Sequence, residues 1–204
     1  MFERDVDDPL MLIAADQQRA RAAGDANAEL CVLSTVDGRG NAQARTLVLR
    51  EVSDEGALVF MSASSPKWTQ LAERNGHVHV HWPSLGRQYR IDGPWRALTQ
   101  EQLQAHWQQR PWASKVLDWY YEQRAQGTEI DSREALEAGV GATEAALRAQ
   151  HRDEASVPMP PLARGIRVIA HRIEAFSLSD RRRLHDCRLF ERDDSGWRSS
   201  VRVP

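Results

Sequence analysis

The sequence has little cysteine and no long apolar run. Its 204 residues include two cysteines, Cys31 and Cys187. Secreted domains that depend on disulfides usually carry more, so we expect two free, buried thiols in a reducing compartment. No stretch approaches the roughly 20 apolar residues of a membrane helix, and the first residues lack the basic start and apolar run of a signal peptide. The sequence therefore predicts a cytoplasmic protein with no membrane partner.

An excess of charge of either sign is also missing. The chain carries 27 basic and 29 acidic residues, which gives a formal net charge of −2. A broad nucleic-acid-binding surface needs a basic excess, so no nucleic-acid partner is expected, whereas a local basic pocket for one phosphate is compatible with this balance. Hydrophobic residues make up 41% of the chain, enough for a packed core that needs neither a metal nor a disulfide.

Sequence motifs of several common enzyme classes are absent. The chain has neither a Gly-x-Gly-x-x-Gly pattern nor a P-loop, which disfavours dinucleotide-binding and kinase-like sites. It has no Gly-x-Ser-x-Gly nucleophile elbow, which disfavours an α/β-hydrolase.

Short strands separated by tight turns are predicted at both ends of the chain. Such a succession, with a strand about every 8 to 12 residues, is typical of an antiparallel barrel or sandwich. The expected strands are 29–36, 43–52, 57–62, 77–82, 87–97, 165–178, 187–192 and 197–203.

Helices are expected near the N-terminus, after the third strand and throughout the middle of the chain. Asp8 and Ser65 are capping residues, and each is followed by a proline at the first helical position, Pro9 and Pro66. Thr99 and Gln102 form a capping-box pattern. The prolines of 157–161 break regular structure. The sequence thus predicts a single mainly β domain over 1–204, with a helical insertion at about 99–151.

Three groups of polar residues are candidates for chemistry. Arg45 and Arg50 lie on one strand, and strict alternation directs their side chains to opposite faces. These arginines either bind an anion or extend their charged ends into water. Ser64-Ser65-Pro66-Lys67 combines hydroxyls, a helix start and a lysine, which suits a phosphate but is also a common helix start. Arg183-Leu184-His185-Asp186 follows two further arginines and is either a functional turn or a solvated basic loop.

Three histidines alternate along one strand. His77, His79 and His81 therefore share one face, a spacing that can bind zinc. No cysteine or carboxylate in the same strand completes a ligand set, so we expect no metal site and interpret these histidines as lining a groove or an interface.

The spacing of these segments resembles that of the pyridoxamine phosphate oxidase family from about Asp8 to Pro204. Four segments resemble the family's FMN-binding motifs: 34–40, 45–50, Ser65-Pro66-Lys67 and Arg87-Gln88. Arg110-Pro111 with Ser114 resembles its substrate-phosphate helix. Val157-Pro158-Met159-Pro160 and 183–186 resemble its C-terminal motif.

The resemblance implies a homodimeric, antiparallel FMN-binding split β-barrel, with FMN held across the subunit interface. Arg45 and Lys67 would bind the FMN phosphate. Gln88 and Gln123 would bond the flavin ring and Phe176 would pack near it. The remaining cofactor-binding positions would be Thr46, Leu47, Val48, Leu49, Arg50, Phe60 and Met61. The substrate phosphate would be bound by Arg50, His106, Arg110 and Ser114, and Arg183 and His185 would face the substrate ring as catalytic residues.

The chain departs from the family pattern at five positions. Arg50 replaces a lysine, His106 a tyrosine, Pro66 an arginine, Arg124 a serine and Cys187 an arginine, with Arg188 one place later. The basic N-terminal segment of the family is absent as well.

Three functions follow from the resemblance and these departures. The first is an oxidase that converts pyridoxine or pyridoxamine phosphate to pyridoxal phosphate, with oxygen as acceptor. The second is a related FMN-dependent oxidase for another small molecule, such as a phenazine-type precursor. The third is a non-catalytic protein that binds FMN or pyridoxal phosphate.

Overall fold

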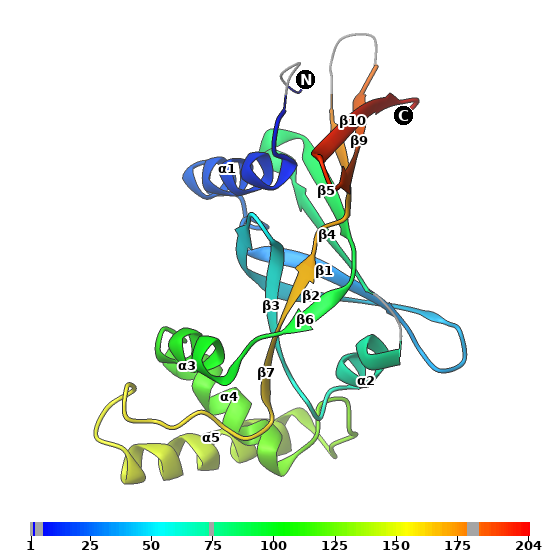
Figure 1. The fold of residues 1–204 in the computed structure, drawn as a ribbon. Coiled ribbons are helices and arrows are strands. Elements are labelled where there is room, and N and C mark those ends of the chain that lie inside the picture. The colour runs from blue at the N-terminus through cyan, green and yellow to red at the C-terminus, as the bar shows by residue number, and fades with distance from the viewer. Residues whose placement is uncertain (1, 3–5, 74–75, 179–183) are drawn as a thin grey trace. The chain divides into compact units, whose positions relative to one another are not determined.

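The computed structural model describes residues 2, 6–73, 76–178 and 184–204, which form two compact units (Figure 1). The sheet unit comprises 1–60, 70–96 and 166–204, and the helical unit comprises 61–69 and 97–165. The prediction of a single domain over 1–204 stays a prediction.

The described residues form one ten-stranded sheet in the order β10-β9-β8-β5-β4-β1-β2-β3-β7-β6. The strands are β1 Leu30–Val36, β2 Ala42–Ser53, β3 Gly56–Ser62, β4 His77–Trp82, β5 Arg87–Asp92, β6 Trp95–Ala97, β7 Ala163–Ile169, β8 Arg172–Ser177, β9 Asp186–Asp193 and β10 Gly196–Arg202. The helices are α1 Pro9–Ala22, α2 Pro66–Glu73, α3 Gln100–Gln108, α4 Trp112–Gln123 and α5 Arg133–Gln150, with a 3-10 turn, η1, at Pro83–Leu85. The ladder from β10 to β3 is antiparallel.

Local capping explains where the helices begin. Asp8 accepts a hydrogen bond from the amide of Leu10 at 2.8 Å, and Pro9 occupies the first helical position of α1. Thr99 and Gln102 form the predicted reciprocal capping box at the start of α3. Both starts were predictable because they depend on residues close together in sequence.

In the sheet unit, α1 lies on one face of the sheet and closes the core. Leu10 and Ile13 are fully buried there, as are Leu33, Trp82 and Tyr89 from the strands. The Tyr89 hydroxyl donates to the carboxylate of Asp16, which is itself buried in α1. This bond satisfies two polar groups that would otherwise be costly in the core.

Two predicted strands are each broken by a corner, so their expected bounds are wrong. The strand expected at 87–97 splits into β5 and β6 at Gly93-Pro94, and that expected at 165–178 splits into β7 and β8 at Ala170-His171. The corners bond to each other, because the amide of Ile169 donates to the carbonyl of Pro94 at 2.8 Å and that of His171 to the carbonyl of Asp92 at 3.0 Å. Contacts between segments so far apart in sequence leave no local signal.

A β-bulge interrupts the alternation predicted for 43–52. Leu49 pairs with Val59 but Glu51 pairs with Leu58, so Arg50 is the extra residue on β2. The buried side chains of β2 are therefore Leu49 and Val52, three residues apart rather than two. The strict alternation expected along this strand is therefore wrong from Arg50 onward.

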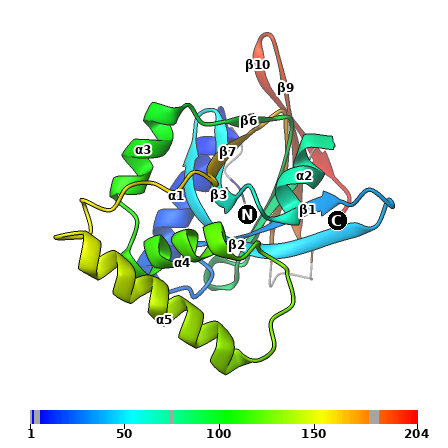
Figure 2. The ribbon, with the colours of Figure 1, turned by 90° about the horizontal axis from the view of Figure 1, so that it is seen from below.

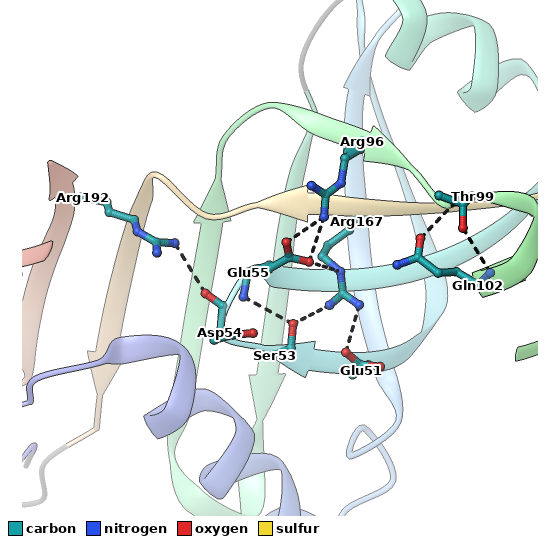
Figure 3. A network of polar contacts seen from close by, with 9 residues as sticks. All are labelled: Glu51, Ser53, Asp54, Glu55, Arg96, Thr99, Gln102, Arg167 and Arg192. Atoms are coloured by element: carbon teal, nitrogen blue, oxygen red, sulfur yellow. Dashed lines mark hydrogen bonds and ion pairs between the residues drawn. The ribbon is translucent and has the colours of Figure 1, made fainter. Parts of the chain in front are cut away.

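An ion-pair network holds the β2–β3 hairpin immediately after this bulge (Figure 3). Arg167 on β7 binds Glu51 at 3.0 Å and donates to the hydroxyl of Ser53 at 2.6 Å. Arg96 on β6 binds Glu55 at 2.7 Å. The Arg167 side chain is 9% exposed and that of Glu51 is 37% exposed, so this contact beside the bulge pairs a desolvated cation with a partly solvated carboxylate.

In the helical unit, α4 and α5 lie side by side (Figure 2). The core contains Trp107, Val116, Leu147 and Val157. The segment 157–161 is irregular, as predicted, and indole N–H groups satisfy its carbonyls. Trp107 donates to the carbonyl of Val157 at 2.8 Å, and Trp119 donates to that of Pro158 at 2.9 Å.

We predict that Gly93→Ala strongly destabilises the fold. A Cβ atom at this position would lie 1.8 Å from the carbonyl oxygen of Ile169, a backbone atom that cannot move aside without disturbing both corners. Urea unfolding should show a loss of about 3 kcal/mol in the free energy of unfolding. Gly141→Ala in α5 is the matched control, because a Cβ there meets nothing within 4 Å. It should stabilise the helix by up to about 1 kcal/mol, and equal stability of the two variants would contradict the prediction.

Candidate functional site

Three residues expected near the flavin or substrate ring are adjacent in the sheet unit. Gln88 on β5 is the cross-strand partner of Phe176 on β8. The ring centroid of His185 lies 4.9 Å from that of Phe176. Directly paired residues of antiparallel strands share a face of the sheet, so the structure brings together Gln88, Phe176 and His185. Arg183, the other expected catalytic residue, lies outside the described residues.

Arg45 is held in a polar cradle between β1 and α2. Its guanidinium donates to the hydroxyl of Thr35 at 2.6 Å, to the carbonyl of Leu33 at 3.2 Å and to the side-chain oxygen of Gln70 at 3.0 Å. Burial lowers the pKa of Arg45, but an arginine stays charged at any physiological pH. Sequence reasoning missed Gln70, whose only signal is its place about one helical turn after Lys67.

The other residues of β2 expected to line the cofactor alternate in exposure. Thr46 and Val48 are exposed, Leu47 is half-buried and Leu49 is fully buried in the core. Leu49 could therefore reach a ligand only through its backbone. Arg50 is half-buried at the bulge.

Lys67 lies in a second polar cluster, which belongs to the helical unit. Its ammonium donates to the hydroxyl of Ser65 at 2.5 Å and to the side-chain oxygen of Gln126 at 3.1 Å. The hydroxyls of Ser62 and Ser64 lie 2.8 Å apart beside it. Lys67, Ser65 and Ser62 are all buried, so these polar groups are desolvated at the start of α2, an arrangement that suits an anion.

Gln126 was not predicted from the sequence, and the expected role of Gln123 at the flavin ring stays a prediction. Gln123 is exposed at the end of α4, whereas Gln126 follows that helix and bonds Lys67. Phe60 is half-buried and Met61 is buried at the end of β3.

Three of the four residues expected to bind a substrate phosphate lie around the turn between α3 and α4, whereas the fourth, Arg50, is on β2. His106 lies in the last turn of α3 and Ser114 in the first turn of α4, and both are half-buried. Arg110 between them binds Asp118 at 2.8 Å. Burial lowers the pKa of Arg110, and the carboxylate of Asp118 opposes that effect.

A buried lysine lies beside this arginine. Lys115 is fully buried in α4 and donates to the carbonyl of Glu154 at 2.7 Å. Its ammonium lies 5.4 Å from the ring centroid of Trp107, and the Arg110 guanidinium lies 5.9 Å from the same ring. Burial, followed by the nearby charge of Arg110, lowers the pKa of Lys115, and the charge of Glu154 counteracts both.

The three alternating histidines share one face of β4, as predicted. His77 is paired with Asp92 at 2.5 Å, and Nε2 of His79 lies 3.4 Å from the side-chain oxygen of Gln88. His79 and His81 line a pocket of about 290 Å³ together with Asn27 and Thr46. No cluster of three or more potential metal ligands occurs within the described part of the chain.

The comparison with known proteins decides the family. Residues 18–146, more than half of the chain, match the family described as pyridoxamine 5′-phosphate oxidase. The chain belongs to this family. A relative from Myxococcus xanthus (strain DK1622), named pyridoxine/pyridoxamine 5′-phosphate oxidase, is 30% identical over 97% of this chain and 92% of its own length. A relative of the same name from Sphingopyxis alaskensis is 33% identical over 100% of this chain and 91% of its own.

Solved structures show the same fold. PhzG from Burkholderia lata 383, crystallised with tetrahydrophenazine-1-carboxylic acid, matches with a TM-score of 0.85 at 22% identity and covers 100% of this chain and 98% of that one. A pyridoxamine 5′-phosphate oxidase-related, FMN-binding protein from Nostoc punctiforme PCC 73102 gives 0.74 at 19% identity and covers 95% and 96%. The predicted fold class, an antiparallel split β-barrel with helices, is thereby confirmed.

Cys187, at the position where the resemblance implies an arginine, lies on one face of the sheet with two expected site residues. Cys187 is the cross-strand partner of Phe176, so it belongs to the row that contains Gln88. Arg188, one residue later, points to the opposite face, where it bonds the carbonyl of Phe2 at 3.2 Å and Asp186 at 3.3 Å. Arg188 therefore does not replace the family's arginine in this row.

No helix among the described residues has the length and apolar character needed to span a bilayer.

We predict that both cysteines are unreactive in the native protein. Burial raises the pKa of the Cys31 thiol to about 12. It also raises that of Cys187, and the carboxylates of Glu174 and Asp186 add to the shift. At pH 8 only about one Cys31 thiol in 10,000 is a reactive thiolate. Titration with Ellman's reagent should detect two thiols in guanidinium chloride and none, within minutes, in buffer. Fast modification of the native protein at either position would contradict this prediction.

Proposed function

We propose that the chain is an FMN-dependent oxidoreductase of the pyridoxamine 5′-phosphate oxidase family, with oxygen as the acceptor, and that it works as a homodimer. The observation that carries the proposal is the Lys67 cluster, in which a buried ammonium lies among serine hydroxyls at the start of α2. Such a donor set fits the phosphate of FMN, because charge-assisted bonds from desolvated donors bind a dianion strongly.

Arg45 is the second proposed phosphate ligand. Its contacts with Thr35 and Gln70 leave it among neutral oxygens, so its charge is not cancelled by a carboxylate among the described contacts. These bonds restrict the guanidinium to one position, which lowers the entropic cost of binding an anion.

The row that contains Gln88, Phe176 and His185 fits a planar ring. The Gln88 amide can bond the polar edge of a flavin, and Phe176 offers an apolar ring for packing. His185, packed against Phe176, would orient the substrate ring toward the flavin. FMN, when bound, supplies the hydride acceptor, and the protein supplies orientation and electrostatics.

The proposed dimer interface includes the face of the sheet that α1 leaves uncovered. On β2, Ala44, Thr46 and Val48 are exposed, and Leu30 and Val32 on the adjacent β1 are half-exposed. A second copy would remove these apolar side chains from water. We expect an obligate interface of this kind to bury about 2,000 Å² or more.

Two substrate candidates remain for this site. The names of the curated relatives support pyridoxine or pyridoxamine 5′-phosphate. The likeness to PhzG, crystallised with a tetrahydrophenazine carboxylic acid, supports a phenazine-precursor type of substrate.

The purified protein should be a yellow dimer that produces hydrogen peroxide. Light scattering and the visible flavin spectrum test the assembly and the cofactor, and a peroxide assay with both substrate candidates tests turnover. A monomer that gains no flavin absorbance after FMN addition would overturn the proposal. Bound FMN without turnover of either candidate would indicate a binding protein instead.

Arg45→Ala and Lys67→Ala should each weaken FMN binding. Each variant loses a charge-assisted contact, which corresponds to roughly ten-fold or more in Kd. Fluorescence titration of apoprotein with FMN measures the effect. Arg133→Ala is the matched control, because Arg133 is an exposed arginine paired with Glu137 on α5. Affinities unchanged in both test variants would place the phosphate elsewhere.

A further inference from the structure

The helical unit contains a poorly exposed ion pair between Arg110 and Asp118. The Nη2 atom of Arg110 lies 2.8 Å from an Oδ2 atom of Asp118, and the two side chains are only 11% and 16% exposed. Water therefore screens this pair far less than it screens the surface pair of Arg133 and Glu137, whose side chains are 75% and 61% exposed.

The position of Arg110 makes this contact relevant to the substrate. Arg110 follows α3 and precedes Pro111, and it lies between His106 and Ser114 in sequence. The family resemblance implies that these three residues bind the substrate's phosphate, so under the proposed function they would face the substrate's polar group. Asp118, one helical turn after Ser114 on α4, places a carboxylate on the same guanidinium.

This carboxylate changes which anions the site can accept. A phosphate dianion bound to Arg110 would share the guanidinium with Asp118, so three negative charges would meet one arginine in a poorly screened environment. The neighbouring Lys115 adds one positive charge, so Arg110 and Lys115 balance Asp118 plus a carboxylate but leave one negative charge in excess with Asp118 plus a phosphate dianion. A guanidinium has five donors, so it can retain Asp118 and still bond one carboxylate or one hydroxyl.

We propose that Asp118 is a specificity-determining residue that makes the Arg110 position accept a substrate group with at most one negative charge, a carboxylate or a hydroxyl, in preference to a phosphate dianion. This inference rests on the proposed function, because it takes Arg110 as part of the substrate site. Of the two substrate candidates, it favours the monocarboxylate.

The experiment compares ligand binding to the FMN-loaded protein and to its Asp118→Asn variant. Isothermal titration measures the Kd of pyridoxine, of pyridoxine 5′-phosphate and of phenazine-1-carboxylate. The wild type should bind the carboxylate more tightly than the phosphate. Asp118→Asn should tighten pyridoxine 5′-phosphate by roughly ten-fold or more and leave pyridoxine within about two-fold, because only the dianion is repelled by Asp118.

Glu137→Gln is the matched control. It also removes one carboxylate that is paired with an arginine, and thus changes the net charge equally, but on the exposed face of α5. It should leave all three Kd values unchanged. If Asp118→Asn unfolds, as judged by circular dichroism, Asp118→Ser is used in the same titrations.

The outcomes separate this inference from the proposed function. Absence of flavin from the wild type after FMN addition overturns the proposed function. FMN-loaded Asp118→Asn with no gain in pyridoxine 5′-phosphate affinity, whether the ligand binds weakly or not at all, overturns the role of Asp118. A loss of thermal stability without a change in ligand preference would show that the pair only anchors α4.

Discussion

Desolvated cations are the constraint on which the structure of this protein depends. Each buried or half-buried arginine or lysine needs acceptors, since an uncompensated charge in the interior is far more costly than a buried apolar group. The chain meets this need in two ways. Arg167 and Arg110 are paired with carboxylates, those of Glu51 and Asp118, whereas Arg45 bonds hydroxyl, amide and carbonyl oxygens. A carboxylate cancels the charge locally, while neutral oxygens position the guanidinium and leave its charge available to an anion.

This difference connects the fold to the site. The pair of Arg167 and Glu51 acts immediately after the bulge at Arg50 and fixes the strand at the point where its phase changes (Figure 3). Bulges redirect side chains, so the direction of Arg50 follows from a contact made by β7, more than a hundred residues later in the chain. The resemblance implies that Arg50 binds both cofactor and substrate. The direction of its side chain is set by tertiary structure rather than by its own strand.

The parts of the fold that the sequence predicts well are those governed by neighbouring residues. Asp8-Pro9 and the pair Thr99 and Gln102 begin helices through bonds within one turn, and the alternation of His77 to Trp82 is preserved on β4. The bulge at Arg50 and the corner at Gly93 depend on segments that meet only after folding. The site follows the same division. Its motifs are visible in the sequence, but Gln70, Gln126 and Asp118 are recognisable only once their partners are placed.

The helical unit shows how a segment with few backbone donors can still hold a site precisely. The prolines of 157–161 lack N–H groups, so this segment cannot form a strand or helix, and its carbonyls must find donors elsewhere. Trp107 on α3 and Trp119 on α4 supply them, and Glu122 on α4 accepts from the amide of Leu162 at 2.6 Å. Because α3 and α4 bond the same segment, their relative orientation is fixed around Arg110, which lies between them. The proline-rich segment therefore holds α4 where Asp118 meets that arginine, and the proposed substrate preference depends on this contact.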